Sequence, residues 1–365
     1  MKDYVINLLD NLLESIESFD LKKKISILLL VSIIGVWASY SAYNELTFPY
    51  EDCKSFGKLA EYGMGICTDY GMRLNFMYNY EELHRGNQPL RAVTFELLNL
   101  SNNVFGDYRI IPFISSGLLL ALTYFITTHL TGRNYTGLIA VLFVLHSPIF
   151  YKYDLVMTYP NFWATLFLAS LYFTFVKWQL SPIAIFVGMS AKVLNLLNLP
   201  AVIMFTILTD NKNRKKLLSS YALILTTAIT IVLSSKYLYP PLWYKFYVVF
   251  LVQFQVQPTE FLWWLGMWSI ELFTDKITLF MIFLLLPALF LLKKAKVKNS
   301  SAILVMIIIF ILQPAFISGF TQYTNEDYRF IHLVVFVGIG TAFLIPNIKK
   351  LSESFQSFFI IKKKK

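Results

Sequence analysis

The chain has 365 residues, of which 56% are hydrophobic and only 15% are charged. About a quarter of the residues of a soluble domain are charged, so this composition, with a mean hydropathy of +0.57, excludes an ordinary soluble enzyme and predicts a multi-pass membrane protein. The formal net charge is +10, but the basic residues lie between apolar runs, which is the positive-inside pattern. We therefore expect membrane lipid as a partner, and no nucleic acid.

The first 24 residues place apolar side chains at helical spacing with acids on the other face, which predicts an amphipathic helix at the membrane surface. Three lysines at 22–24 precede the first apolar run, residues 25–43, which is long enough to cross a bilayer. Because basic residues favour the cytoplasmic side, we expect a cytoplasmic N-terminus.

Nine more apolar runs follow, so the sequence predicts an all-α, polytopic helical bundle of about ten spans. These runs are residues 110–130, 135–150, 159–177, 181–192, 195–209, 217–236, 276–292, 300–318 and 330–346. All the basic turns fall on the cytoplasmic side if residues 181–209 cross twice. The alternative is a re-entrant pair around Lys192, Asn195 and Asn198, because each half is short for a full span.

The apolar runs define one transmembrane domain, residues 25–346, between the cytoplasmic helix 1–24 and a basic cytoplasmic tail, residues 347–365. Two long segments are expected on the extracytoplasmic side: a first loop, 44–108, with amphipathic helices, and an aromatic interfacial segment, 237–275. We expect a protein of the cell membrane, or of the endoplasmic reticulum in a eukaryote, with both termini in the cytoplasm.

The first loop contains the only two cysteines, Cys53 and Cys67. On the extracytoplasmic side they are compatible with a disulfide and equally with two unpaired thiols. The four histidines show no ligand-like spacing, so we expect no cofactor, although a divalent cation would be compatible with the sequence.

Charged residues gather at the expected extracytoplasmic ends of the spans. Glu51 and Asp52 follow the first span, and three cations lie near the ends of later spans: Arg109, Lys192 and Arg329. Charges at membrane depth are costly and usually face a partner or a cavity. The ordinary alternatives are acids in a solvated loop and cations that anchor to lipid or reach the interface.

The order of several motifs resembles the polytopic glycosyltransferases of the C-type fold, in particular the protein O-mannosyltransferase and lipid A aminoarabinose transferase branch. Asp52, Phe56 and Ala60 match the acid, aromatic and alanine of that family's first loop, although Glu51 precedes the acid and Cys53 replaces the one after it. The further similar segments are 87–89, 108–112, 131–133, 146–148, 188–192 and Arg329.

The resemblance implies a hexosyltransferase. It would move mannose or a similar sugar from a polyprenyl-phosphate donor to an extracytoplasmic protein, lipid or glycan, by an inverting displacement. Asp52 would be the base, with Glu51 as the second candidate, and the three cations named above would bind the donor phosphate. Four residues are expected to contact the acceptor or the sugar: Asn87, Gln88, His146 and Tyr159.

The alternative class is a non-catalytic membrane scaffold, or a transporter with a transferase-like fold. A transporter would favour internal repeats with matching broken helices, and only residues 181–209 offer such a break. The scaffold alternative stays open because Asn87 replaces the family's histidine and the acid pair is reversed. The sequence identifies neither the acceptor nor a partner subunit.

Overall fold

The computed structural model describes residues 2–43, 92–107, 109–154, 160–191, 193–240, 243, 275–321 and 330–363. All regular secondary structure within these ranges is helical, which confirms the all-α prediction. The helices are α1 (Lys2–Ser41), α4 (Ala92–Phe105), α5 (Ile110–Thr131), α6 (Asn134–His146), α7 (Pro148–Tyr153), α8 (Pro160–Val176), α9 (Leu180–Ala191), η4 (Val193–Asn198), α10 (Leu199–Leu208), α11 (Arg214–Leu238), α14 (Lys276–Lys294), α15 (Ser300–Thr321), α16 (Ile331–Leu344), η8 (Ile345–Asn347) and α17 (Ile348–Lys363).

Five helical segments in the described ranges are long and apolar enough to cross a membrane. They are Leu21–Ser41, Ile110–Thr131, Arg214–Leu238, Lys276–Lys294 and Ile331–Ser357. Five shorter apolar helices of 10–17 residues are Asn134–His146, Trp163–Val176, Leu180–Ala191, Asn195–Leu208 and Ser300–Pro314. Each predicted apolar run falls on one of these helices. The segments are compatible with an integral membrane protein, and the number of crossings stays a prediction.

The N-terminal part of the chain differs from the division expected from the sequence. The expected surface helix, residues 1–24, and the first span are continuous in the 40-residue helix α1. No turn separates them, because the sequence between them contains neither proline nor glycine, the residues that most readily interrupt a helix. A position at the membrane surface for residues 1–24 stays a prediction.

Residues 181–209 form a helical hairpin. At its tip, the carbonyl oxygen of Ala191 in α9 accepts a hydrogen bond of 2.7 Å from Thr94 in α4. The segment η4 then reverses the chain, and α10 returns toward the start of α9. At the open end of the hairpin, Asn211 donates 2.6 Å to the carbonyl oxygen of Thr174 at the end of α8.

The turns that carry basic residues meet at one end of the bundle, which we call the basic end and define by the turns 131–133, 177–179, 209–213 and 295–299. Asn299 donates 2.8 Å to the carbonyl oxygen of Leu130, and the Lys298 ammonium lies 3.1 Å from the Asp210 carboxylate. These contacts join turns far apart in the sequence. They agree with the positive-inside pattern, which requires such turns to share one side.

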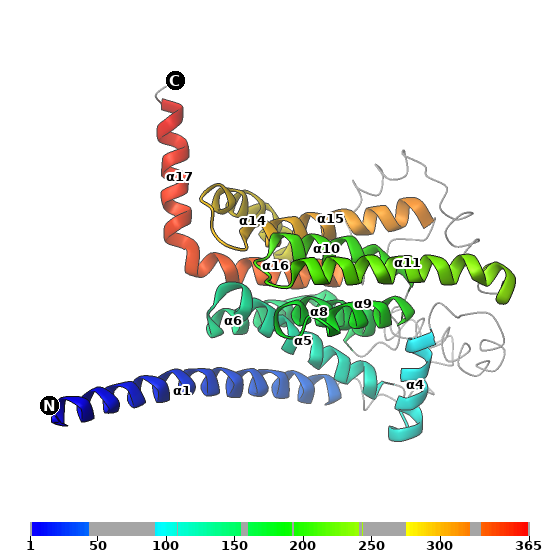
Figure 1. The fold of residues 1–365 in the computed structure, drawn as a ribbon, viewed down its shortest axis with the longest axis horizontal. Helices are drawn as coiled ribbons and strands as arrows, with labels where there is room; N and C mark the ends of the chain where they lie inside the picture. Colours follow the sequence, from blue (N-terminus) through cyan, green and yellow to red (C-terminus); the bar gives the residue numbers. More distant parts are fainter. Residues whose placement is uncertain are drawn as a thin grey trace.

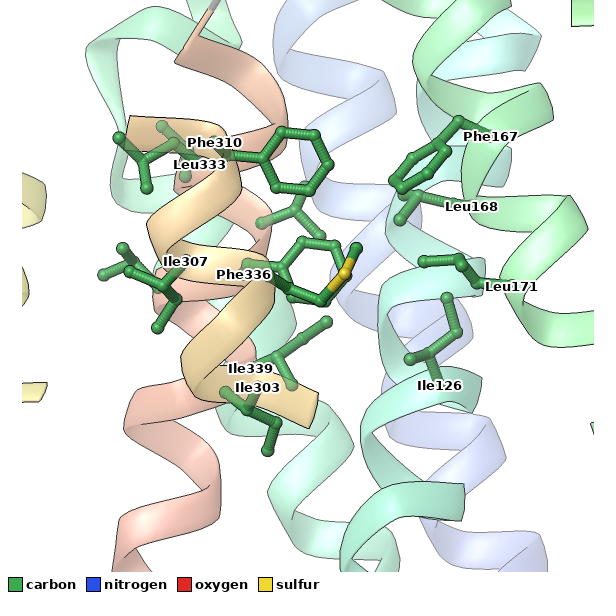
Figure 2. Packing of buried hydrophobic residues seen from close by; sticks show 14 of the residues in the cluster. Ile126, Phe167, Leu168, Leu171, Ile303, Ile307, Phe310, Leu333, Phe336 and Ile339 are labelled. Carbon is green, nitrogen blue, oxygen red and sulfur yellow. The ribbon is translucent and has the colours of Figure 1, made fainter. Parts of the chain in front are cut away.

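The core of the bundle surrounds α16, whose residues are almost all buried. A helix that is apolar on every side is expected to be enclosed by others. Figure 2 shows the aromatic part of this core, where Phe310 of α15 points toward Phe167 of α8. Their ring centroids are 5.5 Å apart in an edge-on arrangement, and Phe310 stacks on Phe336 of α16 at 5.4 Å. Figure 1 shows most of the longer helices running alongside one another around this core.

Helix α6 approaches α5 closely at Gly137. A Cβ atom there would lie 2.8 Å from the carbonyl oxygen of Tyr124 and 2.6 Å from the hydroxyl oxygen of Thr128. Such distances are shorter than van der Waals contact, and a backbone oxygen cannot rotate away. Only glycine therefore permits this packing of α6 on α5.

Replacing Gly137 by alanine should lower thermal stability, because the two helices must separate; overpacking of this kind costs about 1–3 kcal/mol. Gly35→Ala is the matched control, since its Cβ would meet no atom within 4 Å and alanine is the better helix former by about 1 kcal/mol. Melting temperatures in detergent would check both variants. A Gly137→Ala protein as stable as the wild type would contradict the close approach.

Candidate functional site

Two buried aspartates, Asp154 and Asp275, lie at the end of the bundle opposite the basic end. Helix α6 begins beside the basic turn 131–133, and Asp154 follows α6 and α7 at the other end of the bundle. Helix α14 begins after Asp275 and ends at Lys293 and Lys294, beside the basic end. Their side chains are only 1% and 2% exposed. A carboxylate buried among apolar helices is costly unless it accepts hydrogen bonds, so their partners define the local structure.

Asp154 joins α1 to the rest of the bundle. Its Oδ2 atom accepts 2.9 Å from Trp37 Nε1 and 2.7 Å from Ser41 Oγ, both in the last turns of α1. Its main-chain oxygen accepts from Ser116 of α5. The Trp37 ring also stacks on Phe113 of α5 at 5.1 Å. One aspartate therefore fixes where α1 ends relative to α5 and α7.

Asp275 joins the turn between α6 and α7 to the start of α14. It is the N-cap of α14: its carboxylate accepts 2.9 Å from the Thr278 main-chain N–H and 2.8 Å from the Thr278 hydroxyl. The Ser147 hydroxyl donates to the same carboxylate. An N-cap of this kind satisfies main-chain donors that the helix leaves open. The residue next to His146 is thereby held against α14.

A groove of about 790 Å³ lies between α1, α6 and α7. Its walls are mostly aliphatic toward the middle of the helices, and imidazole and phenol groups stand where α6 ends and α7 follows. The lining residues are Ser32, Ile33, Val36, Trp37, Tyr40, Leu142, Leu145, His146 and Tyr151. The groove is therefore apolar along its length and polar at the end that lies nearest Asp154 in the chain.

Tyr151 is the phenol of the groove that the Asp154 charge affects most directly. Burial raises the pKa of Tyr151 above its ordinary value of 10.0, and the negative charge of Asp154 and the neighbouring Tyr40 raise it further. The Tyr40 ring meets Tyr151 edge-on at 5.9 Å. With a raised pKa the phenol keeps its proton at neutral pH, so it can donate a hydrogen bond to a bound polar group but cannot serve as a base there.

The predicted phosphate-binding Arg109 lies at the start of α5 in an ion pair. Its Nε atom is 3.1 Å from both carboxylate oxygens of Asp107, and its Nη2 atom is 2.7 Å from Oδ2. The guanidinium is buried, and Asp107 balances its charge. Asp107 already occupies the Nε and Nη2 edge of the Arg109 guanidinium, so a phosphate would have to bind elsewhere on that group. A role for Arg109 in phosphate binding stays a prediction.

His146 is the other predicted site residue that the structure describes. It ends α6, is exposed, and lines the groove together with Trp37 and Tyr151. A contact between His146 and a sugar or an acceptor stays a prediction. Outside the described residues lie Glu51, Asp52, Cys53, Cys67, Asn87, Gln88, Tyr159, Lys192 and Arg329.

Four residues of this end, Asp154, Asp275, Trp37 and Tyr151, were not predicted from the sequence. A usable signal was present for Asp154, because it is an isolated acid at the end of a strongly apolar and aromatic stretch, and such acids require specific partners. Nothing in the sequence pattern named Trp37 as that partner, since the two residues are 117 positions apart.

The groove offers an aliphatic wall to an apolar group, and His146, Tyr151 and Tyr40 provide polar atoms beside it. Among the described residues, no group of three or more His, Cys, Asp or Glu side chains could hold a metal ion. Comparisons with protein-family models, with curated proteins and with solved structures gave no match for this chain.

Replacing Asp154 by alanine should destabilise the protein, because the Trp37 N–H and the Ser41 hydroxyl lose their acceptor; each buried donor left unsatisfied costs about 1–3 kcal/mol. Thermal unfolding in detergent measures the loss. Ser39→Ala is the control, since Ser39 lies on the same helix, is exposed and bonds only its own helix at Gly35. Its change should stay within about 0.5 kcal/mol. Similar melting temperatures for the two variants would show that Asp154 does not fix α1.

Proposed function

We propose that the chain is a membrane glycosyltransferase. It transfers a hexose, mannose or a similar sugar, from a polyprenyl-phosphate donor to an extracytoplasmic protein, lipid or glycan. The observation that carries the proposal is the groove between α1, α6 and α7, about 790 Å³ in volume, which is apolar along its length and ends at His146 and Tyr151. A polyprenyl-phosphate sugar has the matching shape, a long apolar chain with a polar head.

The reaction needs a base, and the first loop supplies the candidate acids. Asp52 takes the proton of the acceptor hydroxyl while the acceptor oxygen attacks the anomeric carbon, and Glu51 is the second candidate. The bond between this carbon and the phosphate oxygen breaks, the lipid phosphate leaves with the electron pair, and the configuration inverts. Asp52 is nine residues beyond Tyr43, where the described part of the first span ends, so an extended chain reaches about 30 Å at most from that point.

The leaving phosphate gains negative charge, which cations stabilise. Arg109 starts α5 at the end of the bundle opposite the basic end. Lys192 directly follows Ala191, which lies at the tip of the α9–α10 hairpin. Arg329 directly precedes Phe330, which comes before α16. The described residues Arg109, Ala191 and Phe330 therefore lie toward one side of the bundle. Lys192 and Arg329 are the sequence neighbours of the last two, which supports a shared role of the three cations toward one phosphate.

The topology of the proposed enzyme is about ten spans in the arrangement of the C-type fold, with both termini in the cytoplasm. The joined basic turns support this orientation, because turns rich in lysine and arginine favour the cytoplasmic side. The groove then opens toward the extracytoplasmic end, where the acceptor would be met.

A transporter is the second candidate, because one observation favours it. The hairpin breaks at η4, where three buried amides follow one another: Asn198 donates to Asn195, and Gln313 of α15 donates 2.5 Å to Asn198. Broken helices with polar groups mark binding sites in many transporters, but these occur in two related halves. The described residues contain no second hairpin of this form, so transfer remains the better-supported function.

Sugar transfer in isolated membranes tests the proposal, with a panel of labelled polyprenyl-phosphate sugars. Asp52→Asn should reduce transfer roughly 100- to 10,000-fold, the contribution of a general base. Glu51→Gln, at matched expression, should have a smaller effect. Absence of transfer by the wild type with every donor would exclude the proposed enzyme and favour a scaffold or transporter. Full activity of both variants would exclude Asp52 and Glu51 as the base.

Filling the groove should weaken use of the lipid donor. Val36→Trp places a large ring at a lining position, whereas Val31→Trp places the same ring at an exposed position of α1 that does not line the groove. We expect Val36→Trp to raise the KM for a long-chain donor several-fold, with less effect on a donor whose chain is shortened to a few carbons. An equal effect of both variants, or the same KM change for both donors, would show that the groove does not hold the lipid.

A further inference from the structure

Helix α17 leaves the bundle at the basic end. The segment η8 separates it from α16, and Pro346 in η8 lacks the main-chain N–H that a continuous helix would need. In Figure 1, α17 (red) runs across the direction of α16 and of the long helix α11, whereas those two run alongside each other. In the proposed topology the bundle helices run along the membrane normal. Of the apolar segment Ile331–Ser357, α16 then runs with the bundle, and α17, which runs across it, lies along the membrane plane.

One face of α17 is apolar. The residues at positions 348, 351 and 355 are Ile, Leu and Phe, which recur at the spacing of one helical face. Leu351 packs against the core of the bundle, whereas Ile348 and Phe355 are 60% and 53% exposed. The bundle therefore covers only part of this face, and two large side chains extend the apolar surface beyond it.

The polar face of α17 and the adjoining turn are basic. Lys349 and Lys350 are exposed on this face, which also holds Glu353. It packs beside α14, whose last turn contains Lys293 and Lys294. A cationic surface next to an exposed apolar stripe complements a leaflet that contains anionic lipid, because the stripe enters the acyl boundary and the lysines meet the headgroups.

We propose that α17 is an interfacial helix that binds anionic phospholipid at the basic end of the bundle. Ile348 and Phe355 enter the leaflet, and Lys349 and Lys350 contact the headgroup layer. This surface is at the opposite end of the molecule from His146 and Tyr151, so its binding to lipid can be measured whether or not the chain transfers a sugar.

Photo-crosslinking of the full chain tests this binding. The photoreactive amino acid benzoylphenylalanine replaces Phe355 in one protein and Glu353, on the polar face, in the matched control. Both proteins are reconstituted into vesicles of phosphatidylcholine with a minority of phosphatidylglycerol, irradiated and analysed by mass spectrometry. We expect at least several-fold more lipid adducts at position 355 than at position 353, and a higher share of phosphatidylglycerol among the adducts than in the vesicle.

The double variant Lys349→Gln, Lys350→Gln tests the attraction of the lysines to anionic headgroups separately from the contact of Phe355 with the leaflet. It should keep the lipid adducts at position 355 but bring the phosphatidylglycerol share down to the vesicle composition. Exposed lysines are replaced without disturbing the core, and size-exclusion chromatography confirms a folded protein. Adducts to protein alone at position 355 would overturn the proposal in favour of packing on another chain. Equal lipid adducts at positions 353 and 355 would overturn it in favour of a fully lipid-embedded helix.

Discussion

The hydrogen bonds that Trp37 and Ser41 donate to Asp154 determine where the first helix stands. Within lipid, apolar side chains gain little by meeting one another, so close packing and polar contacts must fix a helix in its place. A second contact, between Ser26 and Tyr124 at 2.7 Å, holds α1 nearer the basic end. The groove lies between these two points, at residues 32–40. The same polar contacts that attach α1 thereby keep one wall of the groove in position.

The same constraint accounts for the hairpin of α9 and α10. A chain that reverses inside an apolar bundle must satisfy polar groups that a continuous helix would pair by itself. The amides of Asn195, Asn198 and Gln313 form a buried chain at this point, and Asn195 also donates 3.4 Å to the carbonyl oxygen of Trp163. Gly188 provides the space, since a Cβ there would lie 2.3 Å from the Asn195 amide nitrogen. The reversal is thus a packed element in which each amide has a protein partner.

Much of this architecture follows from local sequence pattern. Apolar runs located the helices of the bundle, because hydropathy acts within a few residues. Several of the lysine-rich turns lie together at one end of it, and their place on the cytoplasmic side stays a prediction. The hydrogen-bond partners of buried polar side chains do not follow from local sequence pattern. Ser147 donates to Asp275, which is 128 residues away in the chain. No periodicity indicates which helix contains the acceptor for a given hydroxyl. The site was therefore predicted by resemblance in the first loop, whereas the groove and the two buried aspartates, Asp154 and Asp275, became visible only with the helices assembled.

The long sequence separation within the Asp154 contact also sets the order in which the protein can be assembled. Helix α1 is synthesised first, yet its partner for Trp37 is 117 residues later and that for Ser41 is 113 residues later. At a synthesis rate of about 5–20 residues per second, this interval lasts on the order of ten seconds. Throughout that time the Trp37 N–H and the Ser41 hydroxyl lack the acceptor that they have in the folded protein. Helix α1 is thus held in its final place only after α7 has been made.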